Sequence, residues 1–471
     1  MSGRKYEIGM VGLGIMGRNL LLNMADHGYA VVGYDNDPAR VQALTAESGG
    51  RGIRGAQTLK ECLGLLKSPR AVIMLVPAGP TVDGVIRDLL PHLKARDILI
   101  DCGNSHFTDT NLRQQMLAGE GIHLLGVGIS GGEHGARHGP SIMPGGPRKA
   151  YERVRPMFES VAARVRGEPC VAYLGPGSAG HFVKMVHNGI EYGLMGLIAE
   201  TYDLMKRGLD LTDDELAVIY ERWNEHTFHS YLLEITGHIF RHVDVKTGKK
   251  LIDMILDDAR QKGTGKWTSQ AAMDMHVPVP VIDAAVSVRD ISDRKREREA
   301  ASRVLTGPSI AFQGKRDIFI DELEKALHAA FIITYAQGMV LLRHASDTYG
   351  YALNLADVAR IWRDGCIIRA AVLEDICAMY QSRPDLPNLL LEPHMGQEVA
   401  AREQDLRGMV CSAANLGIPA SGMMAALAYY DNYRSAWLPT NLIQGQRDYF
   451  GAHTYERVDE KGIFHTKWEG G

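Results

Sequence analysis

Four polar side chains at helical spacing are the residues of this sequence best suited to acid–base chemistry. At offsets of zero, three, four and seven residues from the first, they are Lys184, His187, Asn188 and Glu191. These offsets lie on one face of an α-helix, so an ammonium, an imidazole, an amide and a carboxylate would project into one cleft. A solvated helix face is the plainer interpretation. Against it stands the pair Asn188 and Gly189, because a helix interior takes two poor helix formers in succession only where a backbone or a ligand comes close.

The composition is that of an ordinary globular protein with room for about two or three domains. The chain has 471 residues, of which 45% are hydrophobic and 23% charged, and its formal net charge is -4. This balance favours neither nucleic acid nor a membrane surface as a partner. The N-terminus becomes polar and glycine-rich before a signal-like apolar run develops, so we expect a cytoplasmic protein.

The cysteines are scattered along the chain, without a CxxC pair and without a neighbouring histidine at metal-ligand spacing. They are Cys62, Cys102, Cys170, Cys366, Cys377 and Cys411. We therefore expect reduced thiols in the core or on the surface, with no disulfide and no metal site.

A glycine-rich turn near the N-terminus indicates a dinucleotide-binding unit. Residues 6–11 read as a strand, Gly12, Gly14 and Gly17 follow in the pattern GxGxxG, and residues 18–27 continue at helical period. Such glycines permit a tight turn, and the helix N-terminus holds the pyrophosphate. The next strand, residues 30–34, ends on Asp35, where a carboxylate accepts both hydroxyls of the adenosine ribose. An aspartate that caps a strand end is the plainer alternative.

Further apolar strands alternate with helices and predict a doubly wound, mostly parallel sheet of the Rossmann type. The strands are residues 71–76, 98–102 and 123–127, with a helix over 81–94. Cofactor and substrate should meet beyond the carboxyl ends of these strands. There lie Val76, Pro77 and Ala78, then Gly103 and Asn104, then Ser130, Gly131 and Gly132. The last group suits a carboxylate, although a glycine turn needing positive φ reads the same way; the glycine cluster at 144–147 is predicted to be a structural turn.

From about residue 180 the pattern changes to long helical segments, which predicts an all-α second domain. The segments are 179–207, 212–228, 248–259, 281–304, 317–347, 355–380 and 398–415. Between them, residues 261–267 form a cationic, glycine-bearing loop that could bind an anion through Lys262 and Thr264, or be a plain surface turn. Arg289, beside apolar neighbours, is expected to point inward.

The last residues form an extended tail that is too aromatic for disorder and too short for its own core. It holds Arg447 and His453, and we expect it to dock on its own chain or on a partner. The sequence thus divides into a dinucleotide domain, residues 1–179, a helical domain, residues 180–435, and a tail, residues 436–471.

Over essentially its full length, the chain resembles the decarboxylating 6-phosphogluconate dehydrogenases of the pentose phosphate pathway, in their long dimeric form. The motifs that carry the resemblance are GLGIMGRNL, DCGNSHFTDT, GISGGEHGARHGPSIMPGG, GHFVKMVHNGIEYG, QKGTGKWT and NLIQGQRDYFGAHTYE. The resemblance implies oxidative decarboxylation of 6-phosphogluconate to ribulose 5-phosphate.

The resemblance also implies roles for the helix residues. Lys184 would take the proton of the C3 hydroxyl during hydride transfer, and then protonate the keto oxygen as carbon dioxide leaves. Glu191 would protonate C1 of the enediol, and His187 and Asn188 complete the catalytic group. Lys184 must then start neutral and Glu191 must hold a proton, so both pKa values must be shifted.

The family's binding residues map onto this chain in two groups. The carboxylate and hydroxyls would be held by Asn104, Ser130, Gly131, Gly132, His187 and Asn188. The phosphate would be held by Tyr192, Lys262, Thr264 and Arg289. Arg447 and His453 match residues that enter the site from the other subunit's tail, so the resemblance implies a homodimer with shared active sites and no metal.

The cofactor pocket departs from the common family pattern. Its expected residues are Gly12, Leu13, Gly14, Ile15, Met16, Gly17, Asp35, Asn36, Asp37, Val76, Pro77, Ala78 and Asn104. Members that use NADP carry an Asn-Arg-Thr type of triplet where this chain has Asp35, Asn36 and Asp37, and a lysine where it has Pro77. A close like-charge contact costs on the order of 1 to 4 kcal/mol, so we expect NAD to be preferred and NADP to be the weaker alternative.

Two alternatives remain. A related β-hydroxyacid dehydrogenase acting on an unphosphorylated acid would share the lysine helix and the glycine fingerprint, but would leave Lys262, Arg447 and His453 without an anion. A nucleotide-binding sensor without catalysis would not need Lys184 and Glu191 on one face.

Overall fold

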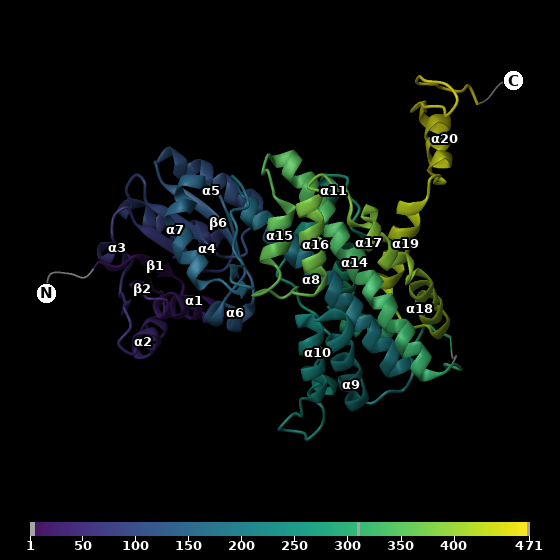
Figure 1. Cartoon of the computed structure of the whole chain (residues 1–471), viewed down its shortest axis with the longest axis horizontal. Helices are drawn as coiled ribbons and strands as arrows, with labels where there is room; N and C mark the ends of the chain where they lie inside the picture. The colour runs from purple at the N-terminus through teal and green to yellow at the C-terminus, as the bar shows by residue number, and fades with distance from the viewer. Residues whose placement is uncertain (1–4, 309–310, 469–471) are drawn as a thin grey trace.

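The computed structural model describes residues 5–308 and 311–468, as two packed domains followed by a projecting helix (Figure 1). The elements of the first domain are β1 (Ile8–Val11), α1 (Ile15–Asp26), β2 (Val31–Tyr34), α2 (Pro38–Ala46), β3 (Ile53–Gly55), α3 (Leu59–Leu65), β4 (Ala71–Met74), α4 (Pro80–Leu89), β5 (Ile98–Asp101), α5 (Phe107–Gly119), β6 (His123–Ile129), α6 (Gly132–His138), β7 (Ile142–Gly145), α7 (Arg148–Val161), β8 (Arg164–Val165) and β9 (Glu168–Pro169). The helices of the second part are α8 (Ala179–Asp203), α9 (Asp213–Trp223), α10 (Tyr231–Arg241), α11 (Thr264–Asp274), α12 (Pro280–Ser292), α13 (Lys295–Ala301), α14 (Arg316–Tyr349), α15 (Leu355–Ile361), α16 (Val372–Ser382), α17 (Pro393–Ala400), α18 (Glu403–Leu416), α19 (Ser421–Arg434) and α20 (Thr440–Gly451).

The first domain is built on a seven-stranded sheet of order β3-β2-β1-β4-β5-β6-β7. All neighbouring strands in it are parallel except β6 and β7, which are antiparallel. The strand order reverses between β1 and β4, which is where a doubly wound sheet opens a ligand crevice. The predicted doubly wound, mostly parallel fold is therefore confirmed, with β3 and β7 as strands that the sequence reading did not include.

The predicted structural turn at 144–147 is wrong in its first half, because Pro144 and Gly145 belong to strand β7. Gly145 is opposite Gly126 in the register, and a Cβ on it would lie 2.3 Å from the backbone nitrogen of Gly180. The glycine is thus needed for close approach of α8. The turn begins at Gly146, whose φ is 128°.

The second domain is helical, as predicted, and α8 lies at its centre. Helices α11, α12, α14 and α19 all pack against it. Among the described helices, α14 is the one long and apolar enough by composition to cross a membrane, but 83% of its most apolar window is buried inside the protein. Such burial is that of a core helix.

Several predicted helix boundaries are corrected. Residues 248–259 form only a short helical turn, Leu251–Met254, because the backbones of Val243 and Lys250 pair across a hairpin instead. The segments 281–304, 355–380 and 398–415 each divide into two helices, and α10, α11 and α19 were not predicted. Gly365, with φ 66°, lies in the break between α15 and α16.

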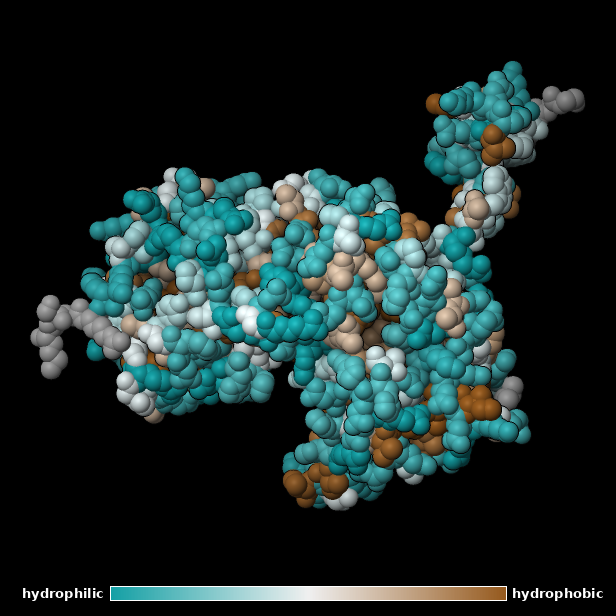
Figure 2. Space-filling view, in the orientation of Figure 1, coloured by the Kyte–Doolittle hydropathy of each residue, from teal (hydrophilic) through white to brown (hydrophobic). Residues whose placement is uncertain are grey.

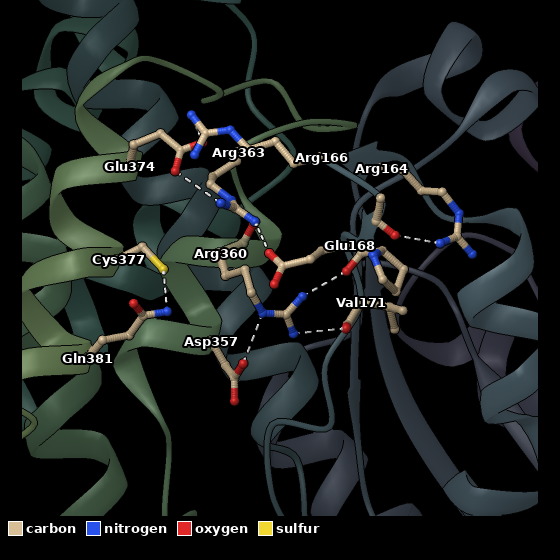
Figure 3. A network of polar contacts seen from close by, with 12 residues as sticks. Arg164, Arg166, Glu168, Val171, Asp357, Arg360, Arg363, Glu374, Cys377 and Gln381 are labelled. Atoms are coloured by element: carbon tan, nitrogen blue, oxygen red, sulfur yellow. Dashed lines mark hydrogen bonds and ion pairs between the residues drawn. The ribbon is translucent and has the colours of Figure 1, made fainter.

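Paired arginines join the two domains at the β8–β9 hairpin (Figure 3). Arg363, which is 8% exposed, donates to Glu168 at 2.6 Å and to Glu374 at 3.0 Å. Arg360 donates to the carbonyl oxygens of Pro169 and Val171. These contacts fix the helical domain against the end of the sheet domain.

The prediction of an extended tail is wrong over Thr440–Gly451, because these residues form helix α20. It projects away from the body of the chain (Figure 1), and hydrophobic residues lie on its surface (Figure 2). Leu442, Ile443 and Phe450 are all more than half exposed. Helical periodicity was hard to recognise here because this helix covers no core of its own chain.

Candidate active site

Helix α8 positions the four polar residues, and glycines at its contacts allow it to lie close to its neighbours. A Cβ on Gly128 of β6 would lie 2.3 Å from Cβ of Lys184, and one on Gly180 would lie 2.2 Å from the carbonyl oxygen of Met143. On the other side, a Cβ on Gly189 would lie 2.6 Å from Thr268 of α11. The expected close approach at Gly189 is therefore confirmed, and it is a protein contact.

A chain of hydrogen bonds links the residues expected to bind and transform the substrate. Ser130 Oγ lies 3.2 Å from His187 Nε2, and His187 Nδ1 lies 2.9 Å from Asn188 Oδ1. Asn188 then donates to Thr264 Oγ1 at 3.2 Å. Because the Asn188 oxygen can only accept, His187 carries its proton on Nδ1 and accepts from the Ser130 hydroxyl at Nε2. The chain runs from the sheet through α8 to α11.

The electrostatics of the helix face favour a neutral lysine and a protonated glutamate. Burial lowers the pKa of Lys184, against the opposing influence of Glu191 and Cys366. Burial raises the pKa of Glu191, against the influence of Lys184 and Arg289. Burial and the nearby Lys184 hold the pKa of His187 well below its usual value. These directions are the ones that a lysine base and a glutamic acid at one site require.

A second group of predicted residues lies where α8, α11 and α12 meet. The guanidinium of Arg289 stacks over the ring of Tyr192 at 3.5 Å, so this half-buried arginine does point inward. Thr264 is buried in the first turn of α11, and Lys262 is exposed just before that turn. Arginine, lysine, hydroxyl and helix N-terminus together could bind a phosphate or a carboxylate.

A cavity of about 890 Å³ opens at the carboxyl ends of β1, β2 and β4. The predicted residues that line it are Gly12, Gly14, Ile15, Met16, Gly17, Asp35, Asn36, Val76, Pro77 and Lys262. Gly12 has φ 98°, and a Cβ on Gly17 would lie 2.0 Å from the carbonyl oxygen of Gly12, so the tight turn depends on glycine. The turn and the start of α1 fit the pyrophosphate of a dinucleotide.

Some expected cofactor residues do not line this cavity. The Leu13 side chain is buried in the core, and only its backbone N–H acts, donating to Asp35 at 2.7 Å. Asp37 caps α2 by accepting from the N–H of Ala39. Ala78 and Asn104 also lie outside the lining, at the ends of β4 and β5.

The structure adds residues that the sequence reading did not assign to the pocket. Arg40 lines the cavity and lies 3.4 Å from Asp35 and 3.5 Å from Asp37. Thr81, Val85 and Asp88 reach it from α4, and Glu133 from α6. The helical spacing of the α4 residues was the available signal, since α4 follows a strand that ends at the crevice.

Arg447 and His453 are not brought to the helix face of their own chain. Arg447 lies in α20 and His453 just after it, both exposed on the projecting tail (Figure 1). Asp448 holds this tail together by accepting from the N–H groups of Thr454 and Thr466 and from the indole of Trp468.

Comparison with known proteins agrees with this geometry. Residues 7–175 match the NAD binding domain of 6-phosphogluconate dehydrogenase, and residues 180–468 match the C-terminal domain of 6-phosphogluconate dehydrogenase. The NADP(+)-dependent decarboxylating 6-phosphogluconate dehydrogenase of Bacillus subtilis is 48% identical over 466 residues, which cover 98% of this chain and 99% of that protein. The decarboxylating enzyme of Escherichia coli is 48% identical over 465 residues, with the same coverage.

Among solved structures, the 6-phosphogluconate dehydrogenase of Plasmodium falciparum matches with a TM-score of 0.94 and 41% identity, covering 98% of this chain and 100% of that one. That protein is described in its apo form, with its cofactor NADP+ and with its substrate 6-phosphogluconate. Both domains and the full length are thus matched together. The chain belongs to the family of decarboxylating 6-phosphogluconate dehydrogenases.

Proposed function

We propose that this chain catalyses the oxidative decarboxylation of 6-phospho-D-gluconate to D-ribulose 5-phosphate and CO2, with NAD preferred over NADP, as a cytoplasmic homodimer. The observation that carries the proposal is a buried Lys184 on the same helix face as Glu191, whose pKa is raised. The names of the full-length relatives state 6-phosphogluconate as the substrate, its dehydrogenation and a decarboxylation, and they name NADP+ as those proteins' cofactor. We assign residues 1–179 to cofactor binding, 180–435 to the substrate, and 436–471 to the partner subunit.

The first step needs a base at the C3 hydroxyl of the sugar acid. Lys184 Nζ, kept neutral by burial, takes the hydroxyl proton while the C3 hydride leaves for the cofactor. The bound nicotinamide supplies the acceptor for that hydride. The products of the step are a β-keto acid and a protonated Lys184, which then holds the proton that the C3 oxygen takes up in the next step.

The later steps need an acid and no metal. As the C1–C2 bond breaks and CO2 leaves, its electrons move to the C3 carbonyl, and Lys184 protonates that oxygen to give an enediol. Glu191 then protonates the carbon that lost CO2, while Lys184 takes back the enediol hydroxyl proton. In this scheme Asn188, His187 and Ser130 orient the substrate through their hydrogen-bond chain.

Charge at the end of β2 supports the preference for NAD. Asp35 and Asn36 line the cavity where the adenosine ribose would bind, and Pro77 offers no cation. Arg40 is the nearby cation, but it is paired with both Asp35 and Asp37. A 2′-phosphate would therefore meet carboxylates whose counter-charge is already engaged, whereas a 2′-hydroxyl can donate to Asp35.

The projecting tail supports a homodimer with shared sites. The lone chain leaves Arg447 and His453 exposed beside the apolar Leu442 and Ile443. Burying the apolar residues on a second copy would remove them from water, and the family resemblance implies that Arg447 and His453 would then reach the partner's phosphate subsite, where both could bind an anion.

Initial rates with 6-phosphogluconate test the proposal. We expect kcat/KM with NAD to exceed that with NADP by at least about tenfold, which corresponds to 1.4 kcal/mol. The same measurement with gluconate should show a large loss, because its missing phosphate leaves Arg289 and Lys262 without a partner. Equal rates with gluconate would favour a dehydrogenase for unphosphorylated acids, and faster NADP reduction would refute the cofactor assignment.

A further inference from the structure

The turn that carries Thr264 is pressed between two aromatic rings. Gly263 has φ 100°, and a Cβ on it would lie 3.3 Å from the indole of Trp267. A Cβ on Gly265 would lie 2.4 Å from the ring of Tyr192. Glycines on both sides of Thr264 thus let the backbone rest against a ring at each end.

Each of these rings has a further partner. Arg289 stacks over Tyr192 at 3.5 Å, within the helical domain. Trp267 instead meets His106, with ring centroids 4.8 Å apart and an interplanar angle of 57°. His106 comes from the sheet domain, in the loop between β5 and α5 and two residues after Asn104. The Trp267 contact therefore crosses from one domain to the other.

His106 is itself held in place, so it can serve as a support. Its Nδ1 is hydrogen bonded to the hydroxyl of Thr108, and its ring lies 4.8 Å from that of Phe107. Phe107 in turn packs edge-on against Phe182 of α8 at 4.9 Å. The imidazole is a fixed surface between the end of β5 and the indole.

We propose that His106 is a positioning residue for the substrate phosphate, acting through Trp267 on the turn from Lys262 to Thr264. A turn that contains Gly263 and is followed directly by Gly265 has many conformations when it is free, and ordering it on binding would cost affinity. Packing of Trp267 between His106 and Gly263 orders the turn in advance. The inference rests on the proposed function, which assigns the phosphate to this turn.

Substitution at His106 and Trp267 tests the inference. In His106→Ala we expect KM for 6-phosphogluconate to rise about three- to tenfold, the range expected for one aromatic contact, with kcat and KM for NAD within about twofold. His106→Phe keeps a ring against the indole and should remain within about twofold of the parent. The double variant His106→Ala with Trp267→Leu should be no worse than Trp267→Leu alone, because both substitutions break one connection.

Calorimetry separates this inference from the proposed function. Binding of 6-phosphogluconate and of inorganic phosphate should both weaken in His106→Ala by more than binding of NAD does, since only Lys262 of this turn also lines the dinucleotide cavity. Failure of the parent protein to oxidise 6-phosphogluconate would refute the proposed function. The titration with inorganic phosphate would still show whether His106 contributes to phosphate affinity. Unchanged phosphate affinity, equal losses for NAD and substrate, or additive effects in the double variant would overturn the inference.

Discussion

The carboxylate of Asp35 accepts a hydrogen bond of 2.7 Å from the backbone N–H of Leu13, so the residue that ends β2 also fixes the glycine-rich turn after β1. Its other oxygen accepts from the N–H of Asp37 at 2.9 Å. Asp35 therefore orders the turn and presents a negative charge to the cavity in which we propose that the cofactor ribose binds. An asparagine could retain an acceptor for the turn while removing that charge.

This double role predicts how the cofactor preference can be changed. The variant Asp35→Asn with Asn36→Arg, Asp37→Thr and Pro77→Lys should raise kcat/KM for NADP at least about tenfold, because two carboxylates are lost and two cations are gained around the 2′-phosphate. Initial rates with both cofactors measure the change. Asp35→Ala is the control, and it should weaken both cofactors since the N–H of Leu13 loses its acceptor. An unchanged ratio in the multiple variant would contradict the prediction.

The pKa shifts on α8 predict the pH dependence of turnover. Burial lowers the pKa of Lys184, so the neutral base forms at lower pH than for a free lysine, and kcat/KM should fall as acid protonates it. Burial raises the pKa of Glu191, so the acid form survives to higher pH, and the rate should fall again on the alkaline side as its proton is lost. Because the two groups interact, the apparent pKa values of the acid and alkaline limbs of the pH profile are properties of the pair and not of either residue alone.

Variants assign the limbs of this profile. Lys184→Met and Lys184→Arg should each lower kcat by about 10²- to 10⁴-fold, since neither can accept the proton. Glu191→Gln should lose the alkaline limb and turn over slowly at every pH. A pH profile from initial rates at saturating cofactor is the measurement, and full turnover in Lys184→Met would rule out the lysine as base.

Local patterns in the sequence were enough to predict the parts of the site that lie on one element. The GxGxxG turn and the face of α8 are short-range features, fixed by glycine conformation and by helical spacing. The break at Gly365 was not predictable in this way, because a Cβ on Gly131 would lie 2.5 Å from the Gly365 carbonyl oxygen, a contact between distant segments. The contact between His106 and Trp267 was not predictable either, because it joins residues of different domains.

The tail could not be predicted as a helix because its stabilising contacts are unusual. Helix α20 buries no apolar stripe, so hydrophobic periodicity carried little information. Its end is fixed by the carboxylate of Asp448, which accepts hydrogen bonds from N–H groups of residues later in the chain. Such a polar centre leaves no periodic pattern in the sequence.

Asp448 predicts a variant that disables the tail alone. Burial would raise its pKa, but hydrogen bonds from His465, Thr466 and Trp468 outweigh burial and lower the pKa to about 2. At pH values above the pKa that this carboxyl has in the unfolded chain, the carboxylate contributes its full stabilisation of the tail. This stabilisation is lost as the pH falls through about 2. Asp448→Ala should unfold the end of the tail at neutral pH, exposing it to limited proteolysis.

The consequence for activity follows from the positions of Arg447 and His453 beside this centre. KM for 6-phosphogluconate should rise at least about tenfold in Asp448→Ala, as for the loss of a charged phosphate contact, with KM for NAD little changed. Asp459→Ala, which removes an exposed carboxylate paired with Arg457 in the same tail, is the matched control and should behave as the parent. Equal effects of the two substitutions would contradict a special role for Asp448.

We predict that Arg363 and Arg166, which both lie near the carboxylate of Glu374, contribute differently to the free energy of unfolding. Arg363 is 8% exposed and lies 3.0 Å from Glu374, whereas Arg166 is 80% exposed and lies 3.9 Å from it (Figure 3). Arg363→Ala removes charged hydrogen bonds to Glu168 and Glu374 and should lower the free energy of unfolding by about 1–3 kcal/mol. Arg166→Ala should cost less than about 0.5 kcal/mol, because exposed pairs are screened by water. Denaturant titrations of both variants measure the difference, and equal midpoints would show that Arg363 does not hold the domains together.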